Sequence, residues 1–153
     1  MPSKTTLKRA RADKRAGKSP GTQAGEFVRE EIDHVREGKH GARSAKQAIA
    51  IGLSKARRAG VELPPPKPGK VSEETRRKAA RDLEKGHQGT PSRRATAKRK
   101  RASTKALKRE GHRAASRAAL SAHSRSAAKR RSPAQRSAAA KRAARTREHH
   151  AHA

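Results

Sequence analysis

The clearest hydrophobic pattern in the chain lies in its first half, where two segments carry bulky apolar residues at helical spacing. In AGEFVREEIDHVREGKH, Val28, Ile32 and Val35 fall at positions i, i+4 and i+7, with Phe27 beside them. Such spacing places the side chains on one face of a helix. Glutamates occupy its first turns, where negative charge suits the helix dipole. The pattern therefore predicts a helix that ends at Gly38.

The second apolar segment has clearer boundaries. Ser44 followed by Gln47 forms a capping box, and Gly60 marks the stop. Gly52, a small residue on the same side as the apolar positions, would let another helix approach closely. We expect the two helices to form an antiparallel hairpin module over residues 22–63. Its predicted contact residues are Phe27, Val28, Ile32, Val35, Ile49, Leu53 and Ala56.

The rest of the chain contains few bulky apolar residues. Residues 1–21 read as a basic disordered arm, and the Pro-rich stretch 64–71 reads as a stiff linker. A short helix with a weak apolar face is predicted over 72–86. Residues 87–153 are a low-complexity Ala/Arg/Lys-rich basic tail, in which Ser132-Pro133 with Gln135 again forms a capping box. We expect latent helices there, frayed by repulsion between like charges.

Composition limits what can form a core. Of the apolar residues, 31 are Ala and only 15 are larger. Burying a large apolar side chain contributes about 1.5–3 kcal/mol, whereas ordering one residue costs about 1–2 kcal/mol of backbone entropy. The sequence therefore predicts a mostly disordered α protein. It should contain a small helical hairpin, latent basic helices and no sizeable core.

The charge of the chain indicates its partner. Forty-two Lys and Arg against thirteen Asp and Glu leave a net charge of +29. Residues 90–153 alone hold twenty of these cations and two acids, while residues 21–63 are nearly neutral. This layout is typical of a small module with nucleic-acid-binding arms.

The predicted phosphate contacts lie in the basic arm and the tail. Arg113, Arg117, Ser121 and Arg125 are four residues apart and should form one stripe. The full set is Lys8, Arg9, Arg11, Arg93, Arg94, Lys98, Arg99, Lys100, Arg101, Lys105, Lys108, Arg109, Arg113, Arg117, Arg125, Lys129, Arg130, Arg131, Arg136, Lys141, Arg142 and Arg145.

Other classes of function fit less well. One Phe and no Trp or Tyr leave almost no platform for base stacking. Duplex DNA, bound by charge and shape without sequence reading, is therefore favoured over RNA. The acids of the hairpin read as surface positions without a pocket, so we expect no enzyme. We expect no membrane segment, no cofactor and no metal site, since the histidines of the EHHAH end lack an outer shell of ligands.

Two resemblances accompany these patterns. The segment SAKQAIAIGLSKARRAGV (44–61), with GEFVREEIDHVREGKHGAR before it, resembles a small bacterial domain family of unknown function over about 22–66. The tail is similar in composition to bacterial histone-like proteins with linker-histone-like tails, although it is richer in Arg than in Lys. That likeness implies non-specific DNA binding and compaction in the cytoplasmic nucleoid. Two alternatives are association with RNA or the ribosome, and a protein partner or self-association through 24–60.

Overall fold

The computed structural model describes residues 1–88 and 93–151, and most of these residues are helical. The helices are α1 (Lys4–Arg15), α2 (Pro20–Arg36), α3 (Ala45–Arg58), α4 (Glu73–His87), α5 (Arg93–Leu107), the 3-10 helix η1 (Arg113–Ala115), α6 (Arg117–Lys129) and α7 (Pro133–Ala151). The chain divides into two units, Met1–Ser116 and Arg117–Ala153.

Serine hydroxyls start the four helices α1–α4. In each case the serine side chain accepts a hydrogen bond from the backbone N–H three residues later, at 3.1–3.3 Å. The caps are Ser3, Ser19, Ser44 and Ser72. Gly38 and Gly60 follow the ends of α2 and α3 with φ of 72° and 87°, a backbone conformation that glycine adopts without strain. The helix boundaries thus follow from short, local signals.

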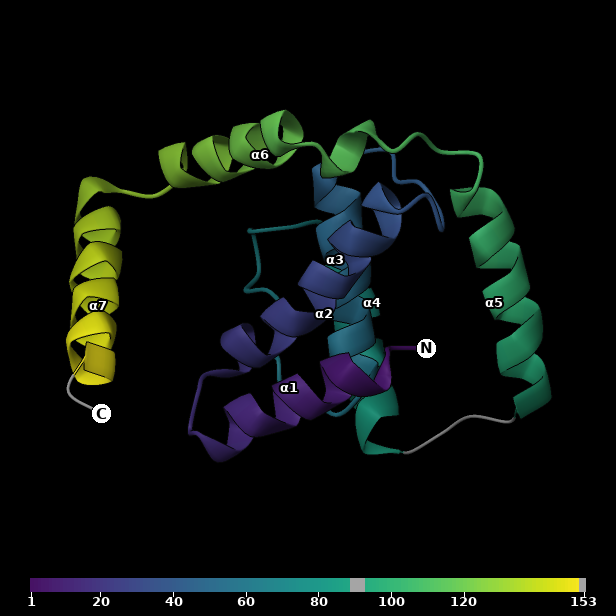
Figure 1. Cartoon of the computed structure of the whole chain (residues 1–153), viewed down its shortest axis with the longest axis horizontal. Helices are drawn as coiled ribbons and strands as arrows, with labels where there is room; N and C mark the ends of the chain where they lie inside the picture. Colours follow the sequence, from purple (N-terminus) through teal and green to yellow (C-terminus); the bar gives the residue numbers. More distant parts are fainter. Residues whose placement is uncertain (89–92, 152–153) are drawn as a thin grey trace. The chain divides into compact units, whose positions relative to one another are not determined.

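The first unit is built around α2 and α3 (Figure 1). Helix α2 packs against both α1 and α3, and α4 covers α3. One core cluster joins Phe27 to Ala10, Ala24, Ala56 and Val61. The hairpin therefore packs against α1, which precedes it in the sequence, and against α4, which follows it.

A second core cluster brings part of the basic tail into the first unit. Ala114 and Ala115 of η1 are buried with Val35, Ala42 and Ala48. Two backbone hydrogen bonds hold the approach, from Gly41 N to the Leu107 carbonyl at 2.9 Å and from Ala42 N to the Gly111 carbonyl at 3.0 Å. Residues up to Ser116 therefore belong to the folded part of the chain.

The expectation of a mostly disordered chain without a sizeable core is wrong. Residues 4–15, expected to be disordered, form a helix packed on α2, and the tail contains ordered helices. The core does not depend on the 15 large apolar residues alone. In the structure most buried apolar residues are alanines, and their small side chains let helix backbones approach closely. Alanine is also the strongest helix former, which lowers the cost of ordering each helix.

The second unit is different in kind. It consists of α6 and α7, and none of its residues between Arg117 and Glu148 is buried. Ser132 accepts from Gln135 N at 3.3 Å while the Gln135 side chain accepts from Ser132 N at 3.2 Å, so the predicted capping box starts α7. Helix propensity supports both helices, and the capping box adds to it at α7. Within the described residues, no helix combines the length and the apolar character needed to span a bilayer.

Candidate nucleic-acid interface

Most acids of the first unit are paired with cations of the same unit. Asp82 Oδ1 of α4 lies 2.8 Å from Arg58 Nε of α3, and Glu110 Oε1 lies 3.7 Å from Arg43 Nε. Further pairs are Asp13 with Lys18, Glu26 with Arg9 and Arg29, Asp33 with Arg36, Glu37 with Lys39, Glu73 with Arg76 and Glu74 with Lys78. The helices α1–α4 thus neutralise part of their own charge.

Arg57 shows that not every cation is available to a partner. It is buried at the end of α3 and donates hydrogen bonds to the carbonyls of Leu63 (3.0 Å) and Pro64 (3.3 Å). Burial lowers the pKa of Arg57, and the nearby Asp82 opposes that shift. Its role is to fix the chain after α3.

The cations of the helices after α4 differ from those of α1–α4 in their exposure and in their ion pairing. Every Lys and Arg from Lys100 to Arg147 is exposed. None of them forms an ion pair within 4.0 Å with an acid in the parts of the chain that the structure describes. Glu110, the one acid within this stretch of sequence, faces Arg43. These helices therefore present uncompensated positive charge to solvent.

The predicted phosphate contacts fall on five elements and their connections. Lys8, Arg9 and Arg11 lie on α1; Arg93, Arg94, Lys98, Arg99, Lys100, Arg101 and Lys105 on α5; Lys108 and Arg109 after it; Arg113 in η1; Arg117, Arg125 and Lys129 on α6; Arg130 and Arg131 in the following turn; Arg136, Lys141, Arg142 and Arg145 on α7. The side chains of Arg93, Arg94, Lys98 and Arg99 lie outside the described residues. Apart from these four, all members of the set are exposed.

The predicted stripe from Arg113 to Arg125 is interrupted. Ser116 adopts an extended conformation, with φ −64° and ψ 153°, and separates Arg113 in η1 from α6. Within α6, Arg117, Arg125 and Lys129 fall within about 120° of one another on the helix circumference. The cations of α7 are spread around that helix. Of α6 and α7, only α6 therefore carries a one-sided row of cations among the described residues.

Of the predicted hairpin contact residues, Phe27, Leu53 and Ala56 belong to one core cluster and Ile32 and Val35 to the other. Phe27, Val35 and Ala56 are buried, and Val28, Ile32, Ile49 and Leu53 are partly buried. The face of α2 that is buried most deeply also contains Glu31, which sequence reasoning placed on the surface. Its position midway between Phe27 and Val35, at i+4 and i+8, was the signal that could have located it.

Several exposed cations were missed as well. Lys4, Lys14 and Arg15 lie on α1 beside the predicted contacts, and Arg147 lies on α7. Their chemistry is the same as that of the predicted set, and composition alone could have included them.

Residues 11–67, from within α1 to the Pro-rich linker, match the model of a family of unknown function (DUF6496). The match agrees with the resemblance of residues 22–66 to a family without an assigned activity and extends it toward the N-terminus. It covers α2 and α3 and leaves out the helices that carry most of the uncompensated charge. No curated protein and no solved structure matches the chain.

Proposed function

We propose that this chain binds nucleic acid through its phosphates, with duplex DNA as the main partner and compaction of a bacterial nucleoid as the result. The observation that carries the proposal is that every Lys and Arg from Lys100 to Arg147 is exposed and has no acidic partner among the described residues. Displacing counterions from a phosphate polymer is the strongest interaction open to such a surface.

The charge and the exposure of the second unit support the proposal. It carries ten Lys and Arg and one Glu, and its described residues bury no side chain. A helical segment that forms no core and repels itself gains stability when phosphates neutralise it. The proposal therefore assigns phosphate binding to α6 and α7, with α5 and α1 as additional contacts.

The same surface favours binding without sequence reading. Lysine and arginine contacts to phosphate fix position but carry no base information. The single aromatic residue, Phe27, is 1% exposed and cannot stack on a base. Binding should then depend on charge and on the shape of the duplex.

The deciding experiment is a gel-shift titration of random duplex DNA at several salt concentrations. The full chain is compared with a triple variant of α6, Arg117→Gln, Arg125→Gln and Lys129→Gln. The matched control removes three exposed cations of α4 instead, Arg77→Gln, Arg81→Gln and Lys85→Gln, which lie among Glu73, Glu74, Asp82 and Glu84.

The logarithm of the binding constant should fall steeply with the logarithm of salt, with a slope of about −0.9 per phosphate engaged. The α6 variant should flatten this slope by about 2–3, and the α4 control by clearly less. A flat salt response, or equal effects of the two variants, would refute the proposal. Competition by structured RNA stronger than that by duplex DNA would refute DNA as the main partner.

A deletion experiment should cut the chain at the boundary between the two units, before Arg117. Removing residues 90–153 also removes Ala114 and Ala115, which are buried against α2 and α3. Deletion from Arg117 leaves the first unit whole and is the informative truncation.

A further inference from the structure

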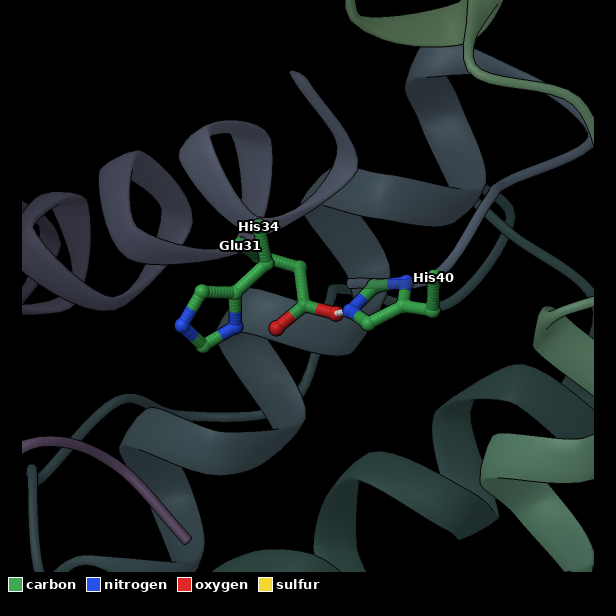
Figure 2. Close-up of side chains that lie close together, drawn as sticks. All are labelled: Glu31, His34 and His40. Carbon is green, nitrogen blue, oxygen red and sulfur yellow. Dashed lines mark ion pairs between the residues drawn. The ribbon is translucent and has the colours of Figure 1, made fainter. Parts of the chain in front are cut away.

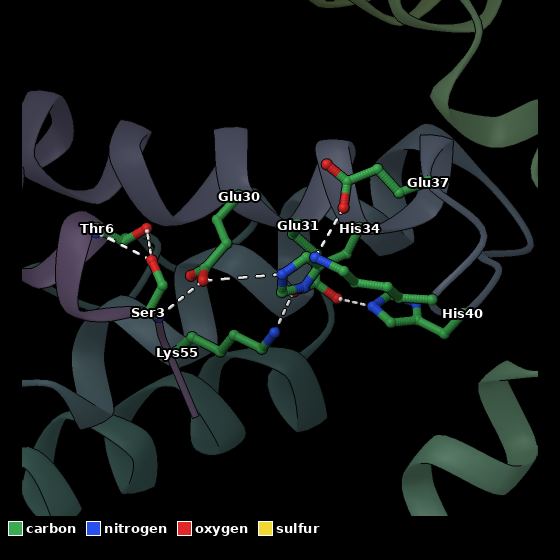
Figure 3. Close-up of polar contacts among 9 residues, drawn as sticks. Ser3, Thr6, Glu30, Glu31, His34, Glu37, His40 and Lys55 are labelled. Atoms are coloured by element: carbon green, nitrogen blue, oxygen red, sulfur yellow. Dashed lines mark hydrogen bonds and ion pairs between the residues drawn. The ribbon is translucent and has the colours of Figure 1, made fainter.

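A buried polar cluster lies between α2, the turn that follows it, and α3. It consists of Glu31, His34 and His40, with Lys55 of α3 beside them (Figures 2 and 3). The Glu31 side chain is 1% exposed, that of His40 is 11% exposed and that of His34 is 21% exposed. A carboxylate at this depth has to be compensated, because an unpaired buried charge is costly.

Three potential ligand atoms converge in this cluster. The Oε1 atom of Glu31 lies 2.9 Å from Nε2 of His40. In Figure 2 one ring nitrogen of His34 is turned toward the same carboxylate. One ligand atom from each of the three residues can be chosen so that all lie within 4.8 Å of one another.

Glu31 and His40 each have an outer hydrogen-bond partner, and His34 has an acid nearby. His40 Nδ1 lies 3.0 Å from the carbonyl of Gly41, and His34 Nε2 lies 3.8 Å from Glu30 Oε1. Lys55 Nζ donates to Glu31 Oε2. Such contacts, from a carbonyl or carboxylate to the second ring nitrogen and from a donor to the second carboxylate oxygen, orient the ligands of metal ions in proteins.

His40 makes two short contacts, from Nε2 to Glu31 Oε1 at 2.9 Å and from Nδ1 to the Gly41 carbonyl at 3.0 Å. If His40 Nδ1 donates to Gly41, a neutral ring presents the lone pair of Nε2 to Glu31 Oε1. Two acceptors would then face each other at 2.9 Å. Glu31 Oε1 is buried and receives no hydrogen bond from any residue that the structure describes. The other neutral tautomer donates from Nε2 to Glu31 Oε1 but turns the lone pair of Nδ1 toward the Gly41 carbonyl. A cation held between Nε2 and Oε1 satisfies both contacts of the ring.

We infer that Glu31, His34 and His40 form a binding site for a divalent transition-metal ion of the zinc class. Two imidazoles and one carboxylate are a ligand set that zinc takes in proteins, with a fourth position left for water. Imidazole nitrogen selects zinc, copper or nickel over magnesium and calcium, which prefer oxygen.

Binding requires a local adjustment. Ligand atoms around a tetrahedral zinc lie about 3.4 Å apart, closer than the widest spacing in this cluster. His40 can supply the movement, because it lies in the non-helical turn after Gly38. The ion would tie this turn to α2, while Glu30 offsets part of the added charge.

Lys55 is the competitor of the metal ion. Its ammonium group forms an ion pair with the Glu31 carboxylate, which the metal ion would also have to bind. The site assignment therefore makes a distinctive prediction. Replacing Lys55 by Gln keeps a donor for Glu31 Oε2 but removes the cation, and metal affinity should rise.

The test uses the full chain with His149→Gln, His150→Gln and His152→Gln, so that the C-terminal histidines do not bind the ion. Zn²⁺ is titrated by calorimetry, and Co²⁺ is titrated while its visible absorption reports the ligands. One equivalent should bind. Glu31→Gln and His34→Gln should each weaken binding by at least about tenfold, Lys55→Gln should strengthen it severalfold, and the matched control His123→Gln in α6 should leave it unchanged.

Absence of binding in this background would overturn the assignment. So would binding that Glu31→Gln and His34→Gln leave unchanged. Should Glu31→Gln unfold the chain, His34→Gln decides, because the His34 side chain lies nearer the surface and circular dichroism can verify its fold. If Lys55→Gln weakens binding, the cluster is a closed ion-pair network and not a metal site.

Discussion

Gly52 of α3 lies directly against the backbone of α2 at Val28: a Cβ atom at Gly52 would be 2.6 Å from the Val28 Cα. The contact is backbone to backbone, so no flexible side chain can move aside. Helices α2 and α3 can only come this close where one of them has no side chain. The small residue noticed in the sequence is therefore the point at which the hairpin is closed.

Gly52→Ala should destabilise the first unit. The added methyl group forces α2 and α3 apart, and overpacking of this kind costs about 1–3 kcal/mol. Urea unfolding followed by circular dichroism measures the change. The matched control is Gly25→Ala, also inside a helix but with no atom within 4 Å of its Cβ position. That control should gain up to about 1 kcal/mol from helix propensity, and equal behaviour of the two variants would contradict the packing described.

Sequence patterns predict the parts of this fold that depend on neighbouring residues. They miss the parts that depend on contacts between residues far apart in the chain. Caps and stops are local, so the serine at position 44 and the glycines at positions 38 and 60 placed α2 and α3 within a few residues. The burial of η1 depends on residues more than sixty positions apart in the chain. Nothing in the composition of RAAS distinguishes Ala114 and Ala115 from the exposed alanines that follow. That part of the fold could not be predicted from periodicity.

Ala115→Asp tests the contact between η1 and the hairpin. Ala115 is 1% exposed among Val35, Ala42 and Ala48, so the variant would bury an unpaired carboxylate. We expect the first unit to lose at least about 3 kcal/mol of stability, or η1 to detach. Hydrogen exchange of the Gly41 and Ala42 amides, which bond to the tail, reports either outcome.

Ala118→Asp provides the control for that experiment, because Ala118 is exposed in α6. It adds the same charge three residues later and should leave the exchange of those amides unchanged. If neither variant changes the hydrogen exchange of these amides, the tail is not held against the hairpin.

The pKa of Glu74 should lie below its ordinary value in the folded chain. The hydrogen bond from Lys78 and the charge of Lys78 lower it, and Arg81 adds to the shift. A carboxyl group with a lowered folded pKa stabilises the fold above its unfolded pKa, and this contribution is lost as the pH falls through the folded value. Because the pair is exposed, the effect on stability is small.

Carboxyl NMR shifts followed between pH 2 and 7 measure that pKa directly. Lys78→Gln should move it back toward the ordinary value, whereas Arg77→Gln, one position away, should leave it nearly unchanged. An unshifted Glu74 in the unaltered chain would show that the ion pair does not form in solution.

The candidate sites were predictable to different degrees. Unpaired cations are visible in composition, because the last sixty residues contain almost no acid to pair with them. The Glu31 cluster could not be predicted from composition, since its residues come from a helix, a turn and a second helix. Only folding brings His40 and Lys55 to opposite oxygens of one carboxylate. The spacing from Phe27 to Val35 could indicate the burial of Glu31, but nothing in the sequence indicates that His40 and Lys55 are its partners.

Ser132→Ala should unwind the start of α7. Ser132 accepts from Gln135 N, and losing such a cap costs about 1 kcal/mol of helix stability. Since no side chain between Arg117 and Glu148 is buried, packing cannot compensate for the loss.

The carbon chemical shifts of residues 133–137 in Ser132→Ala should move toward coil values. Ser137→Ala, an exposed position inside α7, should instead raise helicity slightly. Saturating duplex DNA should restore the helix in Ser132→Ala, because phosphates remove the repulsion between its cations, and a helix insensitive both to the cap and to DNA would contradict this view of the second unit.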